Sequence, residues 1–258
     1  MATIQIIFFD IDGTLVDHAT GCISPKTREA LHRLRNKGVR LCICSGRPPA
    51  TLPDFGDLQF DAFSTFNGSL CYSGDTIIHS SPLAPEDVEK VLANAAALGR
   101  PVSVAVRDRL VANGIDRDLS DYYALAGAKL TVAEDFEETC KEDVYQIMLG
   151  SRKEEHEAII RGASGVKLTV AWERAADVIP ASGGKGIAIT HILAHFGLKP
   201  EEAMAFGDGY NDLEMLQTVG TGIAMGNAPD AVKAVADDVC KPVSQDGIYH
   251  YCLEKGLI

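Results

Sequence analysis

Two aspartates separated by a single residue, Asp10 and Asp12, follow the largely apolar segment Ile4–Phe9 near the start of the chain. Such a segment is typical of a strand buried on both faces, and Gly13 then leaves the backbone free to turn. At that position Asp10 could attack a phosphorus atom, while Asp12 could protonate the leaving oxygen and later deprotonate water. Two crowded carboxylates beside a phosphate also call for a hard cation. The alternative is an acidic turn that merely ends the strand.

Two further segments could hold the phosphate. Ser45 and Gly46 follow a second apolar strand, where a hydroxyl and free backbone N–H groups can bind phosphate oxygens. Lys185 stands at the start of a predicted helix after two glycines, where an ammonium and the free amides of the first turn together suit an anion. The spacing of a Walker A loop is absent from this segment. An ordinary Ser-Gly turn and a solvated lysine at a helix start are the alternatives.

A last acidic segment, Gly207–Asp212, follows another strand and opens a helix. Asp208 could supply a metal ligand, whereas Asn211 and Asp212 could bind phosphate or orient the ligands. The alternative is a helix N-cap, for which Asn and Asp are common. Because the carboxyl ends of strands in an open α/β sheet border one crevice, these segments are expected to converge there. Together they contain a nucleophile, an acid, a hydroxyl, a lysine and a metal ligand, which is a complete set for phosphoryl transfer.

The chain around these residues alternates between strand and helix. Ser24-Pro25 predicts the start of a helix and Gly38 its end, and Val39–Cys44 then reads as the next strand. Phe60–Phe66 is a further predicted strand, and Cys71–Ile78 is a predicted hairpin. The last third returns to the alternation, which predicts a doubly wound parallel sheet of the α/β class. Its predicted elements are helix Lys185–Phe196, strand Met204–Phe206, a helix from Leu213, strand Gly222–Met225 and helix Ala231–Ala236.

Residues 82–181 have a different pattern. Predicted helices at Glu86–Leu98 and Lys153–Arg161 stand among several β-rich segments, a grouping that favours a separate α+β domain. Pro82 and the stretch 182–184 resemble hinges at its two ends. We therefore expect a catalytic core formed by residues 1–81 and 182–258, with an α+β cap of residues 82–181 inserted into it.

The composition excludes some function classes. The 258 residues include 36 acidic and 24 basic side chains, a net charge of −12 that repels nucleic acid and anionic membranes. A phosphate site in such a protein must supply its positive charge locally. Neither a targeting signal nor an apolar run of the ~18 residues needed to span a bilayer is apparent. The seven cysteines form no CxxC pair, so reduced thiols in a cytoplasmic protein are expected.

The segments described above resemble the haloacid dehalogenase superfamily of phosphohydrolases. Asp10–Thr14 resembles the first motif of that superfamily, Ser45 the second, Lys185 the third and Gly207–Asp212 the fourth. The resemblance covers both core segments, and its finer features are those of the Cof-like branch. These finer features are Cys44–Pro48, Asn67-Gly68, Gly207–Leu216, Ala224–Ala228 and Asp246–Ile248.

The resemblance implies a Rossmann-like core, a cap inserted between the second and third motifs, and Mg²⁺ as cofactor. It implies that the Asp10 carboxylate, the Asp12 backbone carbonyl and Asp208 hold the metal. Asp10 would become an aspartyl-phosphate, and Asp12 would be the general acid and base. The other implied roles are the binding of phosphoryl oxygens by Ser45, Gly46, Lys185 and Asn211, and support of the metal ligands by Asp212.

Small phosphorylated metabolites, sugar phosphates in particular, are the substrates that the resemblance implies, and the cap would choose among them. No cap residue transfers by motif, and the large side chains Tyr122, Tyr123, Trp172 and Arg107 are expected to be packing or surface residues. The leading hypothesis is thus a phosphomonoesterase. A phosphomutase would discharge the phospho-enzyme to a second hydroxyl instead of water, and a non-catalytic protein would only bind the phosphorylated ligand.

Overall fold

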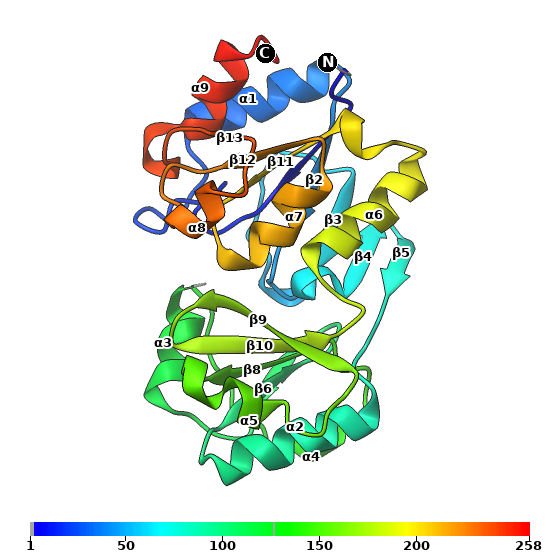
Figure 1. Cartoon of the computed structure of the whole chain (residues 1–258), viewed down its shortest axis with the longest axis vertical. Helices are drawn as coiled ribbons and strands as arrows, with labels where there is room; N and C mark the ends of the chain where they lie inside the picture. Colours follow the sequence, from blue (N-terminus) through cyan, green and yellow to red (C-terminus); the bar gives the residue numbers. More distant parts are fainter. Residues whose placement is uncertain (1–2, 126) are drawn as a thin grey trace.

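The computed structural model describes residues 3–125 and 127–258, whose strands form two sheets (Figure 1). The larger sheet contains β1 (Ile6–Phe9), β2 (Arg40–Cys44), β3 (Ala62–Thr65), β4 (Leu70–Ser73), β5 (Thr76–Ser80), β11 (Ala203–Gly207), β12 (Thr221–Ala224) and β13 (Asp238–Val239). Their order is β13-β12-β11-β1-β2-β3-β4-β5. The strands from β13 to β3 run parallel, whereas β4 and β5 form the predicted hairpin and pair antiparallel at the edge. The predicted α/β class is therefore confirmed, with a sheet that is mixed at one edge.

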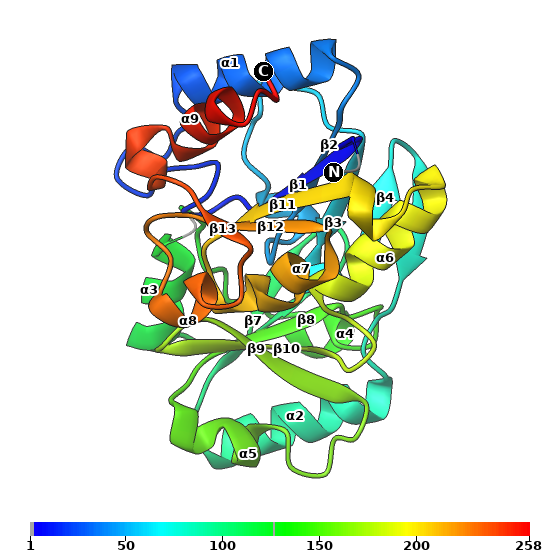
Figure 2. The ribbon, with the colours of Figure 1, turned by 45° about the horizontal axis from the view of Figure 1, so that its top comes forward.

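Helices cover both faces of this sheet. They are α1 (Pro25–Asn36), α6 (Lys185–Phe196), α7 (Leu213–Thr218), α8 (Asp230–Lys233) and α9 (Gly247–Glu254). Figure 2 shows α1 and α9 together on one side of the sheet and α6 and α7 on the other. Alternate residues of β1 serve the two sides, because successive side chains of a strand point to opposite faces. Ile7 and Phe9 belong to the hydrophobic layer under α1 and α9, and Ile6 and Phe8 belong to the layer under α6, α7 and α8.

Local sequence signals set the ends of the two longest core helices. The Ser24 hydroxyl accepts a hydrogen bond from the Thr27 amide at 3.1 Å, and Pro25 occupies the first helical position of α1. Helix α6 ends at Gly197, whose φ of 67° is the left-handed conformation that glycine adopts without strain. Lys185 is the first residue of α6, so the start of this helix brings an ammonium to the edge where β1, β2 and β11 end.

The smaller sheet is antiparallel throughout, with the order β7-β6-β8-β10-β9. Its strands are β6 (Val102–Ala105), β7 (Leu110–Ala112), β8 (Gln146–Gly150), β9 (Val166–Trp172) and β10 (Ala175–Pro180). Helices α2 (Pro85–Ala97), α4 (Phe136–Thr139) and α5 (His156–Ile159) share a hydrophobic core with one face of this sheet. Helix α3 (Arg117–Leu125) packs on the other side, in a cluster that also contains Phe66 of the larger unit.

The chain passes between the two sheets twice, after β5 and before α6 (Figure 1). We propose domain boundaries at 81/82 and 181/182, as the sequence predicts, because both crossings lie there. The expected helix Ala231–Ala236 is shorter than predicted, since α8 ends at Lys233 and the chain then turns back to enter β13. Short 3-10 turns occupy Pro49–Thr51, Phe66–Gly68, Lys153–Glu155, Pro200–Glu202, Tyr210–Asp212 and Val243–Gln245. Among the helices of the described residues, none combines the length and the hydropathy that crossing a bilayer requires.

Candidate active site

The predicted site residues lie together at one edge of the larger sheet. Strand β1 lies between β2 and β11, and each of the three is followed directly by a predicted site residue. These residues are Asp10, Ser45 and Asp208, so the sheet itself makes them neighbours. A cavity of about 290 Å³ opens over this edge. Of the predicted site residues, those that line it are Asp10, Asp12, Ser45, Gly46, Asp208 and Asn211, whereas Lys185 and Asp212 are buried below.

Lys185 is the counter-charge of the site. Its side chain is 1% exposed, and its ammonium donates to Asp10 Oδ1 at 2.6 Å and to Asp212 Oδ1 at 2.5 Å. Burial alone would lower the pKa of Lys185, but the charges of Asp10 and Asp212 raise it above its usual range. A permanent positive charge therefore lies directly behind Asp10, as an anionic substrate in a strongly acidic protein requires.

Three carboxylates crowd the same edge. Asp10, Asp208 and Asp212 each offer an oxygen, and these oxygens lie within 4.8 Å of one another. Burial, opposed by Lys185 and reinforced by the neighbouring carboxylates, raises the pKa of Asp10 well above its usual range. Burial and then the charge of Asp212 raise the pKa of Asp208 to about 7. A divalent cation among these oxygens would relieve the repulsion, and carboxylate oxygens are the ligands that Mg²⁺ prefers.

Asp208 is held in place by residues from two other segments. Its Oδ1 accepts a hydrogen bond from the Thr14 hydroxyl at 2.8 Å, and its Oδ2 accepts one from the Asn227 amide at 3.1 Å. Gly13 has a φ of 83°, and a Cβ atom at this position would lie 2.2 Å from Asp208 Oδ2. Only glycine fits here, both for its backbone conformation and for the approach of the carboxylate.

Asp12 stands apart from the acidic cluster and is paired with Arg47. The guanidinium donates Nε to Asp12 Oδ2 and Nη2 to Oδ1, each at 2.7 Å. Burial alone would lower the pKa of Arg47, but its hydrogen bonds to Asp12 raise it above its usual value. Such a bidentate pair fixes the orientation of a carboxylate as well as its charge. Asp12 is thereby held in the lining of the cavity, apart from the acidic cluster.

The phosphate side of the cavity is built around Ser45, Gly46 and a buried asparagine. Ser45 is 1% exposed, and its hydroxyl accepts a hydrogen bond from the Arg47 amide at 3.1 Å. Asn67 has a φ of 51°, and its Oδ1 accepts a hydrogen bond from Asn211 Nδ2 at 3.0 Å. A Cβ at Gly46 would lie 2.9 Å from the same Oδ1. Asn67 therefore joins the segments after β2 and β11 across the floor of the site.

The smaller sheet and α3 form the opposite wall of the cavity. Tyr122, Tyr123 and Trp172 line it. Tyr123 is also buried in the hydrophobic cluster of α3 and Tyr122 packs against that cluster, so these two are packing residues, as expected, that also border the cavity. The position of Arg107 agrees with the expectation, because it is exposed in the turn between β6 and β7 and is absent from the lining. No local sequence pattern identifies these aromatic residues as cavity residues, because whether they border the cavity depends on how β9 and α3 pack.

Several residues of the site carry no predicted role from the sequence. Thr14 and Asn227 belong to the segments that resemble the superfamily. Their place in these segments could have indicated that they belong to the site. Arg47 adjoins Ser45 but gives no local sign of its pairing with Asp12. Asp177 interrupts the otherwise apolar strand β10, and a lone carboxylate within a buried strand is a recognisable signal.

The comparison with protein families decides the ancestry of this site. A model of the haloacid dehalogenase-like hydrolases matches residues 7–252. The chain belongs to the haloacid dehalogenase-like hydrolases. In this family it is 33% identical to the protein YkrA of Bacillus subtilis (strain 168), and the match covers 98% of each chain. The expected superfamily is thereby confirmed.

Two further family members resemble the chain over nearly their full length. One is the 5-amino-6-(5-phospho-D-ribitylamino)uracil phosphatase YitU of Bacillus subtilis (strain 168), 29% identical over 96% of each chain. The other is the structure of the subclass IIB sugar phosphatase BT4131, with a TM-score of 0.92 and 32% identity, covering 98% of this chain and 100% of that one. The family match together with these relatives confirms the predicted enzyme class, a phosphatase.

Proposed function

We propose that this phosphatase is a Mg²⁺-dependent phosphomonoesterase that forms an aspartyl-phosphate at Asp10 and acts on small phosphorylated metabolites. The observation that carries the proposal is the buried ion cluster in which Lys185 joins Asp10 to Asp212 beside Asp208. It combines a nucleophile, a fixed positive charge and a set of hard oxygen ligands at one cavity.

Each side chain then has a task in phosphoryl transfer. An oxygen of Asp10 attacks the phosphorus while Lys185, the Ser45 hydroxyl and the Gly46 amide hold the phosphoryl oxygens. Asn211 completes this cradle, as the resemblance implies. The charge of Lys185 and the neutral hydrogen-bond donors are in place before the reaction begins. This is the condition for strong electrostatic stabilisation of the transition state.

Asp12 moves the proton. It donates to the leaving oxygen in the first half-reaction and takes a proton from water in the second, when water attacks the phosphorus of the aspartyl-phosphate and releases the Asp10 carboxylate. Its pairing with Arg47 keeps the carboxylate at the cavity and away from the acidic cluster, and one of its oxygens must leave the guanidinium to carry the proton in the first half-reaction. A carboxyl group that must serve both as acid and as base needs such a fixed position.

The residues present fit a magnesium ion. The Asp10 carboxylate, the Asp12 backbone carbonyl and Asp208 would hold it, with Asp212 as support through its hydrogen bonds from the amides of Asp208 and Gly209 at 2.9 and 2.8 Å. When bound, Mg²⁺ neutralises charge on the carboxylates and on the phosphate.

The substrate proposal is a phosphate monoester of a small metabolite. Sugar phosphates are candidates because BT4131 is named a sugar phosphatase, and a phosphorylated ribitylamino-uracil is the substrate in the name of YitU. A cavity of about 290 Å³ suits a ligand of that size. The seven cysteines are free thiols, which supports the proposal of a cytoplasmic protein.

Hydrolysis of p-nitrophenyl phosphate tests the proposed chemistry. Turnover is expected with Mg²⁺ and is expected to stop on chelation by EDTA. Asp10→Asn should lower kcat by about 10⁴-fold or more, because the amide cannot act as the nucleophile. Asp75→Asn, in the exposed hairpin turn, is the matched control and should retain full activity. An Asp10→Asn protein with wild-type turnover would refute the proposal, and stoichiometric transfer to a second hydroxyl would indicate a phosphomutase.

A further inference from the structure

Asp177 is a buried carboxylate that the proposed reaction does not use. It is 2% exposed on β10, a strand that is buried along its whole length. Its oxygens accept hydrogen bonds from the Tyr122 hydroxyl at 3.0 and 3.1 Å and from Asn67 Nδ2 at 3.0 Å. Within residues 3–125 and 127–258, no ion pair of Asp177 with lysine, arginine or histidine is formed. A buried carboxylate without a cation is costly, so the group tends to take up a proton unless a ligand supplies a positive charge that stabilises its ionised form.

The position of Asp177 shows where that charge could come from. It lines the same cavity as Asp10 and Asp12, on the wall that the smaller sheet provides. A phosphate held at Asp10 therefore places its leaving group in the space that Asp177 borders. A carboxylate has about four acceptor sites. Three donors use them here, namely the Tyr122 hydroxyl, which is shared between the two oxygens, the Asn67 amide and Gln146, so there is room for a further donor.

The wall around Asp177 is aromatic and apolar. The rings of Tyr122 and Trp172 lie nearly parallel, with 11° between their planes and 6.3 Å between their centroids. Leu110, Leu125 and Met148 extend the apolar lining. A planar ring could bury its faces against such a wall, which is a large favourable term for an aromatic ligand.

The polar groups of this wall are already hydrogen-bonded within the protein. The Tyr122 hydroxyl donates to Asp177, Gln146 Oε1 accepts from Asn67 Nδ2 at 3.3 Å, and the Tyr123 and Ser103 hydroxyls bond to each other. A hexose with several free hydroxyls would have to leave some of them unsatisfied here. The lining thus favours a ring with a single strong donor over a polyhydroxylated leaving group.

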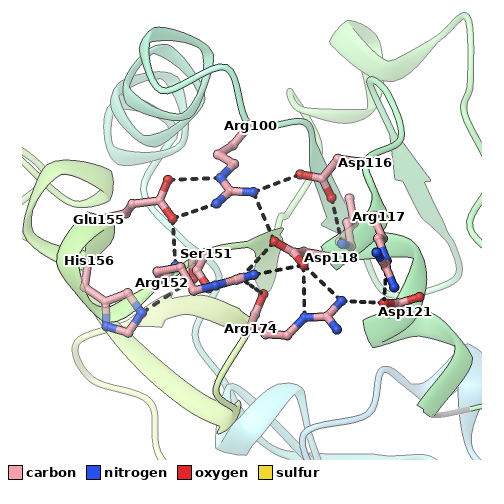
Figure 3. A network of polar contacts seen from close by, with 11 residues as sticks. Arg100, Asp116, Arg117, Asp118, Asp121, Ser151, Arg152, Glu155, His156 and Arg174 are labelled. Atoms are coloured by element: carbon pink, nitrogen blue, oxygen red, sulfur yellow. Dashed lines mark hydrogen bonds and ion pairs between the residues drawn. The ribbon is translucent and has the colours of Figure 1, made fainter.

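An ion network is centred on Asp118, close to the aromatic residues in the sequence and the fold, and Figure 3 shows its polar contacts. Asp118, in α3, accepts hydrogen bonds from Arg152, Arg174 and Arg100 at distances from 2.8 to 3.2 Å. The guanidinium of Arg174 also lies 4.5 Å from the centroid of the Trp172 ring. The network therefore fixes the helix that carries Tyr122 and the strand end that carries Trp172 relative to each other.

We propose that the cap selects phosphate monoesters whose leaving group joins a planar ring to a cationic nitrogen. The ring packs against Tyr122 and Trp172, and the nitrogen donates to Asp177 and supplies its missing counter-charge. This inference rests on the proposed function, because it assigns the leaving-group half of the same cavity. Burial raises the pKa of Asp177 to about 7, which agrees with a carboxylate that a ligand cation would stabilise in its charged form.

Matched esters test the proposal on the wild-type protein. The ortho, meta and para isomers of (aminomethyl)benzyl phosphate are compared with their ethylbenzyl counterparts, in which a methyl group replaces the ammonium. A hexose phosphate is the third arm. The best aminomethyl isomer is expected to exceed its ethyl counterpart by about 10- to 100-fold in kcat/KM, the range of a charge-assisted hydrogen bond. Equal values for every pair, or a hexose phosphate that is turned over faster than all ring esters, would overturn the proposal.

Asp177→Asn removes the charge and keeps the shape of the side chain. The preference for the aminomethyl esters is expected to disappear in this variant and to persist in Asp108→Asn, which changes an exposed residue of the β6–β7 turn. A preference that survives Asp177→Asn would refute the role of this carboxylate. The wild-type comparison decides the question if the variant does not fold.

Calorimetric affinities separate this inference from the proposed reaction. Binding of the same ester pairs is measured with Asp10→Asn, which keeps Asp177 and the aromatic wall. Tighter binding of an aminomethyl ester by 10-fold or more supports the inference even if the wild-type protein hydrolyses nothing. Failure of all esters, with p-nitrophenyl phosphate also inert in the presence of Mg²⁺, would instead refute the phosphatase chemistry. Equal affinities would refute the inference alone.

Discussion

The molecule buries acidic side chains in two places and offsets the cost of their charge in two different ways. In the core, Lys185 lies between Asp10 and Asp212 and supplies a cation from the chain itself. In the cap, Asp177 is equally buried but has only neutral hydrogen-bond donors around it. The core cluster therefore contains its own cation beside the proposed metal, whereas the cap carboxylate would gain one only from the proposed ligand.

This difference agrees with separate roles for the two units, with catalysis in the core and substrate selection in the cap. Attack on a phosphoryl group is the same for every phosphate ester, so its counter-charge can be built in permanently. Leaving groups differ between substrates, and a carboxylate that is stabilised only by the right ligand rejects the others through an unsatisfied charge. Specificity and catalysis can then change separately in one cavity.

The largest expected effect is that of Lys185→Met, which removes the cation from the core. Asp10 and Asp212 would remain buried without a partner, so the free energy of unfolding should fall by about 3–5 kcal/mol. Activity should fall by about 10³-fold or more, because the phosphoryl oxygens lose a fixed charge. Chemical denaturation and phosphate release measure the two effects.

Lys167→Met is the control for that experiment. Lys167 of β9 pairs with Glu214 of α7 at 2.8 Å, and unlike Lys185 these side chains are accessible to solvent, at 31% and 52% exposure. An exposed ion pair contributes about 1 kcal/mol or less, so this variant should stay close to wild type. Equal stability losses for the two lysine variants would show that the core cluster is no more dependent on its cation than a surface pair.

The pH dependence of stability tests the cap side of the comparison. The pKa of Asp177 is raised from 3.8 to about 7 in the folded protein, mainly by burial. A raised carboxyl pKa stabilises the fold when the group is protonated, so this contribution is complete below pH ~4 and is lost as pH rises through about 7. Since one pKa unit corresponds to 1.36 kcal/mol, the loss amounts to about 4 kcal/mol.

Asp177→Asn isolates this contribution, because the other titrating groups are common to both proteins. The free energy of unfolding of the wild type relative to the variant should decline between pH 4 and pH 8. Tyr122 does not titrate in this window, since burial and the charge of Asp177 raise its pKa well above the usual value. A difference that is flat with pH, or that grows with pH, would contradict the uncompensated state of Asp177.

Magnesium should distinguish the two acidic sites. If the metal binds among Asp10, Asp12 and Asp208, it should raise the unfolding free energy by about 2.7 kcal/mol at a hundredfold excess over its Kd. Asp208→Asn should abolish most of this increase, and Asp177→Asn should leave it intact. Thermal unfolding with Mg²⁺ and with EDTA measures it, and an increase that is lost in Asp177→Asn instead would place the metal in the cap.

Short-range patterns in the sequence predict the core better than the cap. Asp10, Ser45 and Asp208 each follow an apolar strand, and parallel strands bring such positions to one edge without further information. The start of α6 at Lys185 is marked by its preceding glycines. The α/β class, the inserted antiparallel sheet and the positions of these residues therefore follow from local signals. Their catalytic roles stay predictions.

The wall of the cap could not be predicted in the same way. Tyr122 and Asp177 are 55 residues apart, and the hydrogen bonds between them depend on the packing of α3 over β10. The sequence does not predict helix α3, because its first turn is polar and resembles a loop. The ion pairs of Asp118 with arginines, which stabilise this turn, form only in the folded protein. The pairing of Arg47 with Asp12 spans 35 residues and likewise has no local signature. Contacts of this kind are set by the tertiary fold.

The smallest expected effect concerns the network that holds the aromatic wall. Asp118→Asn weakens the hydrogen bonds from three arginines at a side chain that is 12% exposed, so a loss of about 1–2 kcal/mol in stability is expected. Asp135→Asn, which breaks the exposed pair with Arg109, should leave the stability close to that of the wild type. Because α3 would be less firmly placed, KM for an (aminomethyl)benzyl phosphate should rise about threefold to tenfold in Asp118→Asn, with kcat within about twofold of wild type. A change in kcat without a change in KM would mean that the network acts on the core chemistry, and the separation between a self-compensated core and a ligand-compensated cap would then fail.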